Sequence, residues 1–127
     1  MRSASSFICR LLVAIQVGLQ LLVLGAPDGK YCGKVGAIFS ISLTFHGDTF
    51  DLDAKYLAYT GSAQNVPYSM PQPDKIRIPL DNPDLNKAFD DLKPPIRRAD
   101  LEYLDYVNDQ ITAHTSLGSL TLAKDTC

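Results

Sequence analysis

Histidine, cysteine and aspartate are the residue types of this 127-residue chain that could carry chemistry. His46 and His114 are the only histidines, and a metal site or a general base would use one of them. Two of the three cysteines, Cys32 and Cys127, are better assigned to a disulfide bond in the mature chain, which leaves too few residues for a cysteine nucleophile or a zinc cluster. We therefore interpret both histidines as exposed polar residues.

Three aspartates stand close together as Asp48, Asp51 and Asp53. Calcium prefers several oxygen ligands, but this spacing lacks the mid-loop glycine and terminal glutamate of an EF-hand. Asp51 and Asp53 alternate with Phe50 and Leu52, which places both carboxylates on the solvent face of a strand. We interpret the group as a solvated strand face and expect no bound metal.

Motifs of the common enzyme classes are absent from the sequence. There is no Gly-x-Ser-x-Gly elbow and no glycine-rich phosphate loop before a helix. The acidic residues outnumber the basic ones, and no basic stripe could meet nucleic-acid phosphates. The sequence thus predicts a protein without enzymatic activity or cofactor that does not bind nucleic acid.

The N-terminal residues have the order of a secretory signal peptide. Arg2 and Arg10 are followed by an apolar run over 11–24 and by small residues, which predicts cleavage after Gly25. The alternative is an uncleaved membrane anchor, but a span needs about 20 apolar residues. This run is shorter and is interrupted by glutamines. We expect a signal peptide over 1–25 and one secreted β-rich domain over 26–127, extracellular and without membrane contact after cleavage.

Cys32 and Cys127 remain once the leader has been removed. An even pair in an oxidising compartment predicts a disulfide bond, the alternatives being two free thiols or an intermolecular bridge. The bond would close almost the whole domain and contribute about 4–5 kcal/mol on the loop-entropy model. It would also make the first strand and the C-terminus neighbours, with Cα atoms within about 7 Å.

Alternation of apolar and polar residues predicts a mainly β fold. It is clearest over 37–45, where Phe39, Ile41 and Leu43 alternate with serine and threonine. Further strands are expected over 49–54, 56–59 (ending in a break at Gly61-Ser62), 66–70, 75–80, 99–107, 110–115 and 120–124. Over 99–107 a helix is the alternative.

One helix is expected over 83–93. Leu85, Ala88, Phe89 and Leu92 share one helical face, Asn82 can cap the start, and two prolines follow the end. Seven to eight short strands with this single helix indicate a small antiparallel β-barrel or sandwich, with the helix on the sheet or across a barrel end.

Gly29-x-Tyr31, followed by an alternating strand, resembles the start of calycin-like (lipocalin-like) β-barrels, which carry Gly-x-Trp at this place. This resemblance implies a barrel. The sequence departs from the pattern because it has no tryptophan, its helix falls in mid-chain, and the chain is short for a lipocalin. It also resembles short secreted proteins of protists that share the Tyr-Cys-Gly start and the "PYSM" and "KIRIPL" segments, and this second resemblance implies no activity.

Tyrosines are the remaining candidates for a binding face, since each offers an apolar body and a polar tip. The five considered are Tyr56, Tyr59, Tyr68, Tyr103 and Tyr106. They could line a pocket for a small apolar ligand or a face for a partner protein, or they could fill the core and its rims. We expect a surface-acting structural or host-interaction protein. The alternatives are a barrel that binds a small ligand, and an enzyme inhibitor that inserts loop 60–67 or 70–75.

Overall fold

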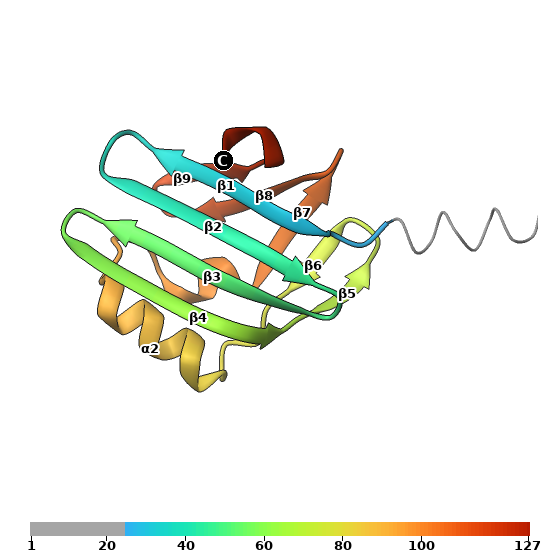
Figure 1. Ribbon diagram of the computed structural model, residues 1–127, viewed down its shortest axis with the longest axis horizontal. Helices are drawn as coiled ribbons and strands as arrows, with labels where there is room; N and C mark the ends of the chain where they lie inside the picture. The colour runs from blue at the N-terminus through green and yellow to red at the C-terminus, as the bar shows by residue number, and fades with distance from the viewer. Residues whose placement is uncertain (1–24) are drawn as a thin grey trace, which may run out of the picture.

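Two antiparallel sheets and one helix make up the computed structural model, which describes residues 25–127 (Figure 1). The predicted signal peptide lies outside the described residues except for Gly25. The N-terminal sheet has the order β1 (Gly29–Val35), β2 (Phe39–His46), β3 (Thr49–Tyr56) and β4 (Tyr59–Pro67). The C-terminal sheet has the order β5 (Ser69–Gln72), β6 (Lys75–Arg77), β7 (Tyr103–Val107), β8 (Gln110–Thr115) and β9 (Gly118–Leu122).

Short turns set the register of both sheets. β2 and β3 pair from Phe39 with Tyr56 to His46 with Thr49, across a turn in which Gly47 has a φ of +68°. Asn108 and Asp109 both have positive φ in the turn between β7 and β8, as a two-residue hairpin turn of this kind requires. The chain therefore folds as successive hairpins, with most of the pairing between neighbours in sequence.

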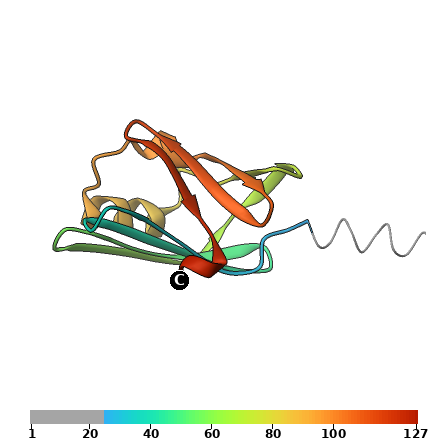
Figure 2. The same cartoon turned by 90° about the horizontal axis from the view of Figure 1, so that it is seen from above.

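The core lies between the two sheets. Figure 2 shows them splayed, with the helix α2 (Pro83–Leu92) in the opening between them. Alternate residues of each strand point inward, and burial removes their apolar surface from water. The largest fully buried side chains are Tyr31, Phe45, Phe50, Val66, Ile76 and Ile111. The short 3-10 helices η1 (Arg98–Leu101) and η2 (Lys124–Thr126) complete the described chain.

The helix forms where its sequence predicts it. The Asn82 side chain accepts a hydrogen bond from the Leu85 N–H at 2.9 Å, and Pro83 occupies the first turn. Its buried residues, among them Leu85 and Ala88, face β4 and β3. The closest approach is at Gly61, where an added Cβ would lie 2.4 Å from the Ala88 carbonyl oxygen.

The two sheets meet along β1 and the end of β9. Cys32 and Ala123 exchange two backbone hydrogen bonds of 2.9 and 3.0 Å. The Sγ atoms of Cys32 and Cys127 lie 2.10 Å apart, at disulfide distance, with a Cα separation of 5.0 Å. On the other side the chain passes from β4 to β5 through Tyr68. Within residues 25–127 the sheets do not close into a continuous barrel.

The mainly β class, the antiparallel sheets and the helix are confirmed, while several strand predictions are corrected. Residues 25–127 form nine strands, and the first of them, β1, runs over Gly29–Val35, where the alternation of residues predicts none. The predicted strand over 56–59 is instead the end of β3 and its turn to β4, in which Leu57 has a φ of +58°. β4 then runs unbroken through Gly61-Ser62, since this glycine makes room for α2. The segment 99–107 begins as η1 and becomes a strand only at Tyr103, and 66–70 is divided between β4 and β5. No helix among residues 25–127 is long and apolar enough to cross a membrane.

Replacement of Gly61 by alanine tests the contact between β4 and α2. We expect Gly61→Ala to lower the free energy of unfolding by about 1–3 kcal/mol, because the new methyl group must push the Ala88 carbonyl away. Urea unfolding measures the change. Ser62→Ala, on the exposed face of the same strand, is the matched control and should change stability by less than about 0.5 kcal/mol. An unchanged midpoint for Gly61→Ala would contradict this helix position.

Candidate functional site

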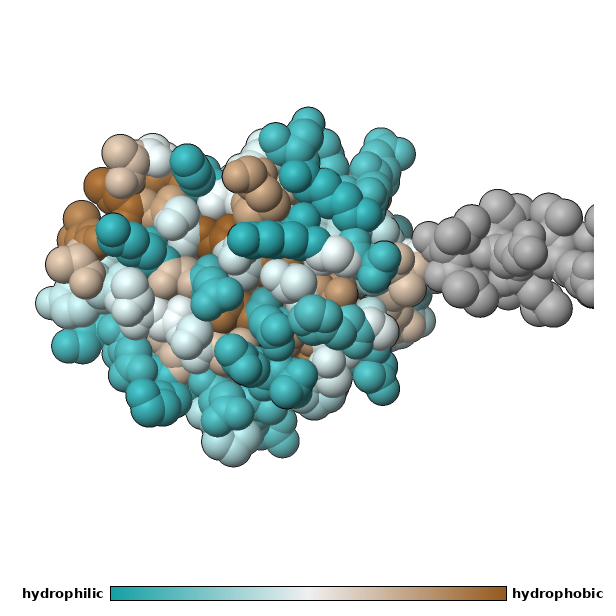
Figure 3. Space-filling model, in the orientation of Figure 1, coloured by the Kyte–Doolittle hydropathy of each residue, from teal (hydrophilic) through white to brown (hydrophobic). Residues whose placement is uncertain are grey.

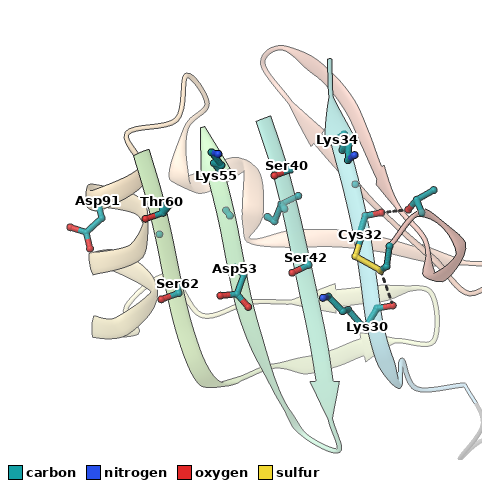
Figure 4. A pocket seen from close by; sticks show the side chains of 16 residues that line it. Lys30, Cys32, Lys34, Ser40, Ser42, Asp53, Lys55, Thr60, Ser62 and Asp91 are labelled. Carbon is teal, nitrogen blue, oxygen red and sulfur yellow. Dashed lines mark hydrogen bonds between the residues drawn. A yellow bond between two sulfur atoms is a disulfide. The ribbon is translucent and has the colours of Figure 1, made fainter. Parts of the chain in front are cut away.

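The outer face of the N-terminal sheet carries an open hollow of about 620 Å³ (Figure 4). Because successive side chains of a strand alternate between faces, the residues that point away from the core gather here. Its polar lining comprises Lys30, Lys34, Ser40, Ser42, Asp53, Lys55, Thr60, Ser62, Asp91 and Thr126. The hollow is thus a polar surface on the side of the sheet opposite the core.

Strand register arranges the floor of the hollow in rows. Ser42 pairs with Asp53, and Asp53 pairs with Ser62, so these three side chains lie across β2, β3 and β4. In the next row Lys55 pairs with Thr60 on one side and Ser40 on the other. Hydroxyl groups on short side chains therefore leave the sheet accessible between the longer lysines.

The walls of the hollow come from both ends of the domain. Lys30 and Lys34 project from β1, and the Thr126 hydroxyl donates a hydrogen bond to the Cys32 carbonyl beside them. Asp91 of α2 stands at the opposite side. No ion pair within residues 25–127 involves Lys30, Lys34 or Lys55. Three ammonium groups are therefore available to an incoming polar molecule.

The hollow is suited to polar recognition rather than to nucleophilic attack. An activated serine needs a hydrogen bond to a base. Within the described chain, no side-chain hydrogen bond joins Ser40, Ser42 or Ser62 to a lysine, histidine or carboxylate. The surface presents serine and threonine hydroxyls, which can donate and accept hydrogen bonds, between lysine ammonium groups and the carboxylates of Asp53 and Asp91.

A second polar row crosses the outer face of the C-terminal sheet. His114 Nε2 lies 2.6 Å from Asp105 Oδ2, and its Nδ1 lies 3.1 Å from Ser119 Oγ. Lys75 also bonds Asp105, and the hydrogen bonds from Lys75 and then His114 hold the pKa of this carboxyl below its usual range. Sequence analysis missed this row, because it depends on the register of β7, β8 and β9.

These residue types are those of a hydrolase triad, but their setting differs. A triad works beside oxyanion donors in a substrate cleft. The hollow on the N-terminal sheet does not reach His114 or Asp105, and 62% of the His114 side chain is exposed. His46 likewise is exposed and pairs with Asp51 at 2.9 Å. Both histidines are exposed polar residues, as predicted.

The five predicted tyrosines do not share one wall. Tyr56 and Tyr59 flank the turn between β3 and β4. Tyr68 packs against Phe45 near the opposite end of the sheet, with ring centres 5.1 Å apart. The other two belong to β7, where Tyr103 is exposed and Tyr106 is partly buried. Within residues 25–127 these five tyrosines therefore line no common mouth to the interior.

Tyr106 belongs instead to a cluster around Asp109 that ties the two sheets together. The buried Tyr31 hydroxyl donates to Asp109 Oδ1 at 2.6 Å, and the Tyr106 hydroxyl donates to the same oxygen at 2.9 Å. Lys124 Nζ lies 3.2 Å from Asp109 Oδ2. The hydrogen bond from Tyr31 is the main cause that lowers the pKa of Asp109, while burial raises the pKa of Tyr31.

This cluster predicts a pH dependence of stability. The pKa of Asp109 is lower in the folded protein than in the unfolded chain, where it is about 4. The ionised carboxylate therefore stabilises the fold fully above the unfolded pKa, and this contribution is lost as the pH falls through the folded pKa. Asp109→Asn should therefore be less stable than the unchanged protein at pH 6. We expect a difference of only about 1 kcal/mol in the free energy of unfolding, because water screens the half-exposed carboxylate. The gap should close on acidification below about pH 4.

Urea unfolding at a series of pH values measures this gap. Asp53→Asn is the matched control, since Asp53 is exposed and has no ion-pair partner among residues 25–127. Equal stability of Asp109→Asn and the unchanged protein at pH 6 would contradict the role of the cluster.

Comparison of the chain with family models, curated proteins and solved structures finds no match. The function must therefore be inferred from the geometry of the surfaces described above.

Proposed function

We propose that this is a small secreted, non-enzymatic protein that acts through its surface, as a host-interaction protein that binds a partner protein on the outer face of the N-terminal sheet. The observation that carries the proposal is the position of the hollow. Its volume of about 620 Å³ lies outside the sheet, whereas the interior is filled by side chains.

The filled interior favours surface contact over an enclosed ligand. The hollows that reach the core measure about 30 and about 20 Å³ and are lined by apolar side chains such as Ile41 and Leu52. Sites for small molecules usually measure about 300–1,000 Å³. A small-ligand-binding barrel would therefore require the core to open.

The inhibitor alternative has less support than surface binding. Of the two segments considered for insertion into an enzyme, 60–67 is held in β4 between β3 and α2. Most of 70–75 belongs to the short hairpin of β5 and β6. Neither segment is a long exposed loop of the kind that enters an active site.

The chemistry of the hollow suits a polar peptide segment as the bound part of the partner. Ser42 and Ser62 are short, so a partner backbone can approach the sheet and exchange hydrogen bonds with their hydroxyls. Lys34 and Lys55 would pair with acidic side chains of that segment, and Asp53 with a basic one. Mixed charge of this kind gives specificity and orientation to a contact more than it gives affinity.

Secretion is tested by the intact mass of the exported protein, with thiol alkylation before and after reduction. We expect a chain that begins at Ala26, no alkylation until reduction, and two alkylations afterwards, since Cys32 and Cys127 lie at disulfide distance. Alkylation of the unreduced protein, a disulfide-linked dimer, or a retained leader would contradict the proposal of a processed, internally bridged, secreted domain.

Binding is tested by selecting random peptides on the immobilised protein and measuring their affinity for variants. The double variant Ser42→Arg, Ser62→Arg fills the hollow, and we expect it to weaken the selected peptides by at least about tenfold, or about 1.4 kcal/mol. Thr112→Arg, Thr121→Arg, on the outer face of the C-terminal sheet, is the matched control and should bind as the unchanged protein does.

Native mass spectrometry of the exported protein completes the test. The mass of the chain alone agrees with surface action. Co-purification of a small apolar molecule would favour the ligand-binding barrel instead. Peptides that bind the double variant unchanged would contradict a peptide site in the hollow.

A further inference from the structure

One end of the domain gathers exposed apolar side chains on the tips of three turns. Val35, at the end of β1, and Ile38, in the turn that leads to β2, are 43% and 51% exposed. Leu57, in the turn between β3 and β4, is 53% exposed, and Leu117, between β8 and β9, is 63% exposed. Figure 3 shows hydrophobic surface gathered at the end of the view where the first two turns lie in Figure 1. We call this region the turn end.

The three turns adjoin one another. The Leu57 N–H donates a hydrogen bond to the Ile38 carbonyl at 2.9 Å. Val35, Ile38 and Leu117 line one apolar groove of about 90 Å³ together with the loop 94–96. Four segments of the chain that are far apart in sequence thus present apolar residues on the same side of the molecule.

Positive charge surrounds these apolar tips. Lys34 and Lys55 stand just before the first two turns, and Lys93, Arg97 and Arg98 flank the loop 94–96. The segments 34–38, 55–60, 93–98 and 115–119 contain these five cations and no acidic residue. Arg97 and Arg98 are paired with Asp100 and Asp90, which flank these segments, so the three lysines supply the net positive charge. Lys34, Lys55 and Lys93 take part in no ion pair within residues 25–127.

The opposite end has the reverse charge. Its turns carry Asp48 between β2 and β3, Asp74 between β5 and β6, and Asp109 between β7 and β8, of which Asp109 is paired with Lys124 and Asp74 adjoins Lys75. The domain over 26–127 has more acidic than basic residues, so the cations at the turn end are not a general property of the surface. Charge is segregated along the strands, with the apolar tips at the positive end.

We propose that the turn end docks on an anionic lipid surface. Protruding apolar side chains can enter the boundary between headgroups and acyl chains, while the surrounding lysines and arginine contact anionic headgroups. The apolar residues project from separate turns around a groove of only about 90 Å³, so they can enter the headgroup boundary of a bilayer independently of one another. The inference concerns contact with a bilayer surface, in place of the expected absence of membrane contact after cleavage. Its apolar tips lie outside the hollow, whereas Lys34 and Lys55 belong to both regions.

Insertion can be followed with a single tryptophan, because the chain contains none. In Leu117→Trp we expect the emission to shift to the blue on addition of vesicles made of equal parts of phosphatidylcholine and phosphatidylserine, and to stay unchanged with phosphatidylcholine alone. Val107→Trp is the matched control, since Val107 is 54% exposed and adjoins the turn that carries Asp109. Its emission should not respond to either vesicle.

Co-sedimentation with the same vesicles tests the charge and the apolar tips separately. Lys34→Gln, Lys55→Gln should weaken partitioning about 30-fold, which corresponds to about 1 kcal/mol for each cation removed. Ile38→Ser, Leu117→Ser should weaken it at least about tenfold. Lys87→Gln, on the exposed face of α2, is the control for the loss of a charge and should change little.

Three results would overturn the proposal. The first is unchanged protein that remains in the supernatant with phosphatidylserine vesicles. The second is partitioning that Lys87→Gln lowers as much as the turn-end variants do. The third is a concentration-dependent dimer that Ile38→Ser, Leu117→Ser abolishes without any vesicle binding, since the turn end would then contact a second copy. Ser42→Arg, Ser62→Arg should keep vesicle binding, which separates failure of this proposal from failure of the peptide site.

Discussion

The pairing of Cys32 with Ala123 is the constraint on which the rest of the structure depends. Each sheet is a series of hairpins with one apolar face, and neither face is protected from water until the other sheet covers it. The two backbone hydrogen bonds of this pair, the adjacent sulfur atoms and the Tyr31–Asp109 bond lie side by side along β1. They fix the angle between the sheets, and they also place the C-terminal residues at the wall of the polar hollow.

The seam where β1 meets the end of β9 closes one side of the core, and the helix α2 covers the opening between the sheets on another (Figure 2). The sizes of the core residues differ between these two places. From β1 across to the connection between β4 and β5, sheet packs on sheet and the space is filled by rings, with Tyr31, Phe45 and Phe50 in contact through edges and tilted faces. Near α2 the sheet carries small residues, Gly61 and Ala63 among them, because a helix backbone must approach closely. The splay of the sheets leaves an opening that strands do not cover, and α2 fills this opening with its buried face (Figure 2).

The local sequence pattern predicted those elements whose apolar and polar residues alternate regularly. It failed where a contact between residues far apart in the chain determines the structure. Alternation identified β2 and β8, and the cap at Asn82 with the following prolines identified α2. Gly61 by itself predicts a break in the strand. Its role is to leave room for the Ala88 carbonyl, which lies more than twenty residues away along the chain. The polar face at Asp53 was predicted from alternation, but the hollow, the Asp105–His114–Ser119 row and the separation of the tyrosines depend on register between strands, which one sequence does not reveal.

The two surfaces inferred here are compatible because of how the strands run. The turn end lies at the tips of the strands, whereas the hollow lies on a sheet face along their length. A domain that stands on its turn end therefore leaves the outer face of the N-terminal sheet open to the side.

Lys34 and Lys55 belong to both regions, so a partner with acidic groups and an anionic lipid would compete for them. Ser62 belongs to the hollow and Leu117 to the turn end, and each can be changed without touching the other region. The acidic opposite end would be repelled by the same lipid surface, so charge alone would orient the domain.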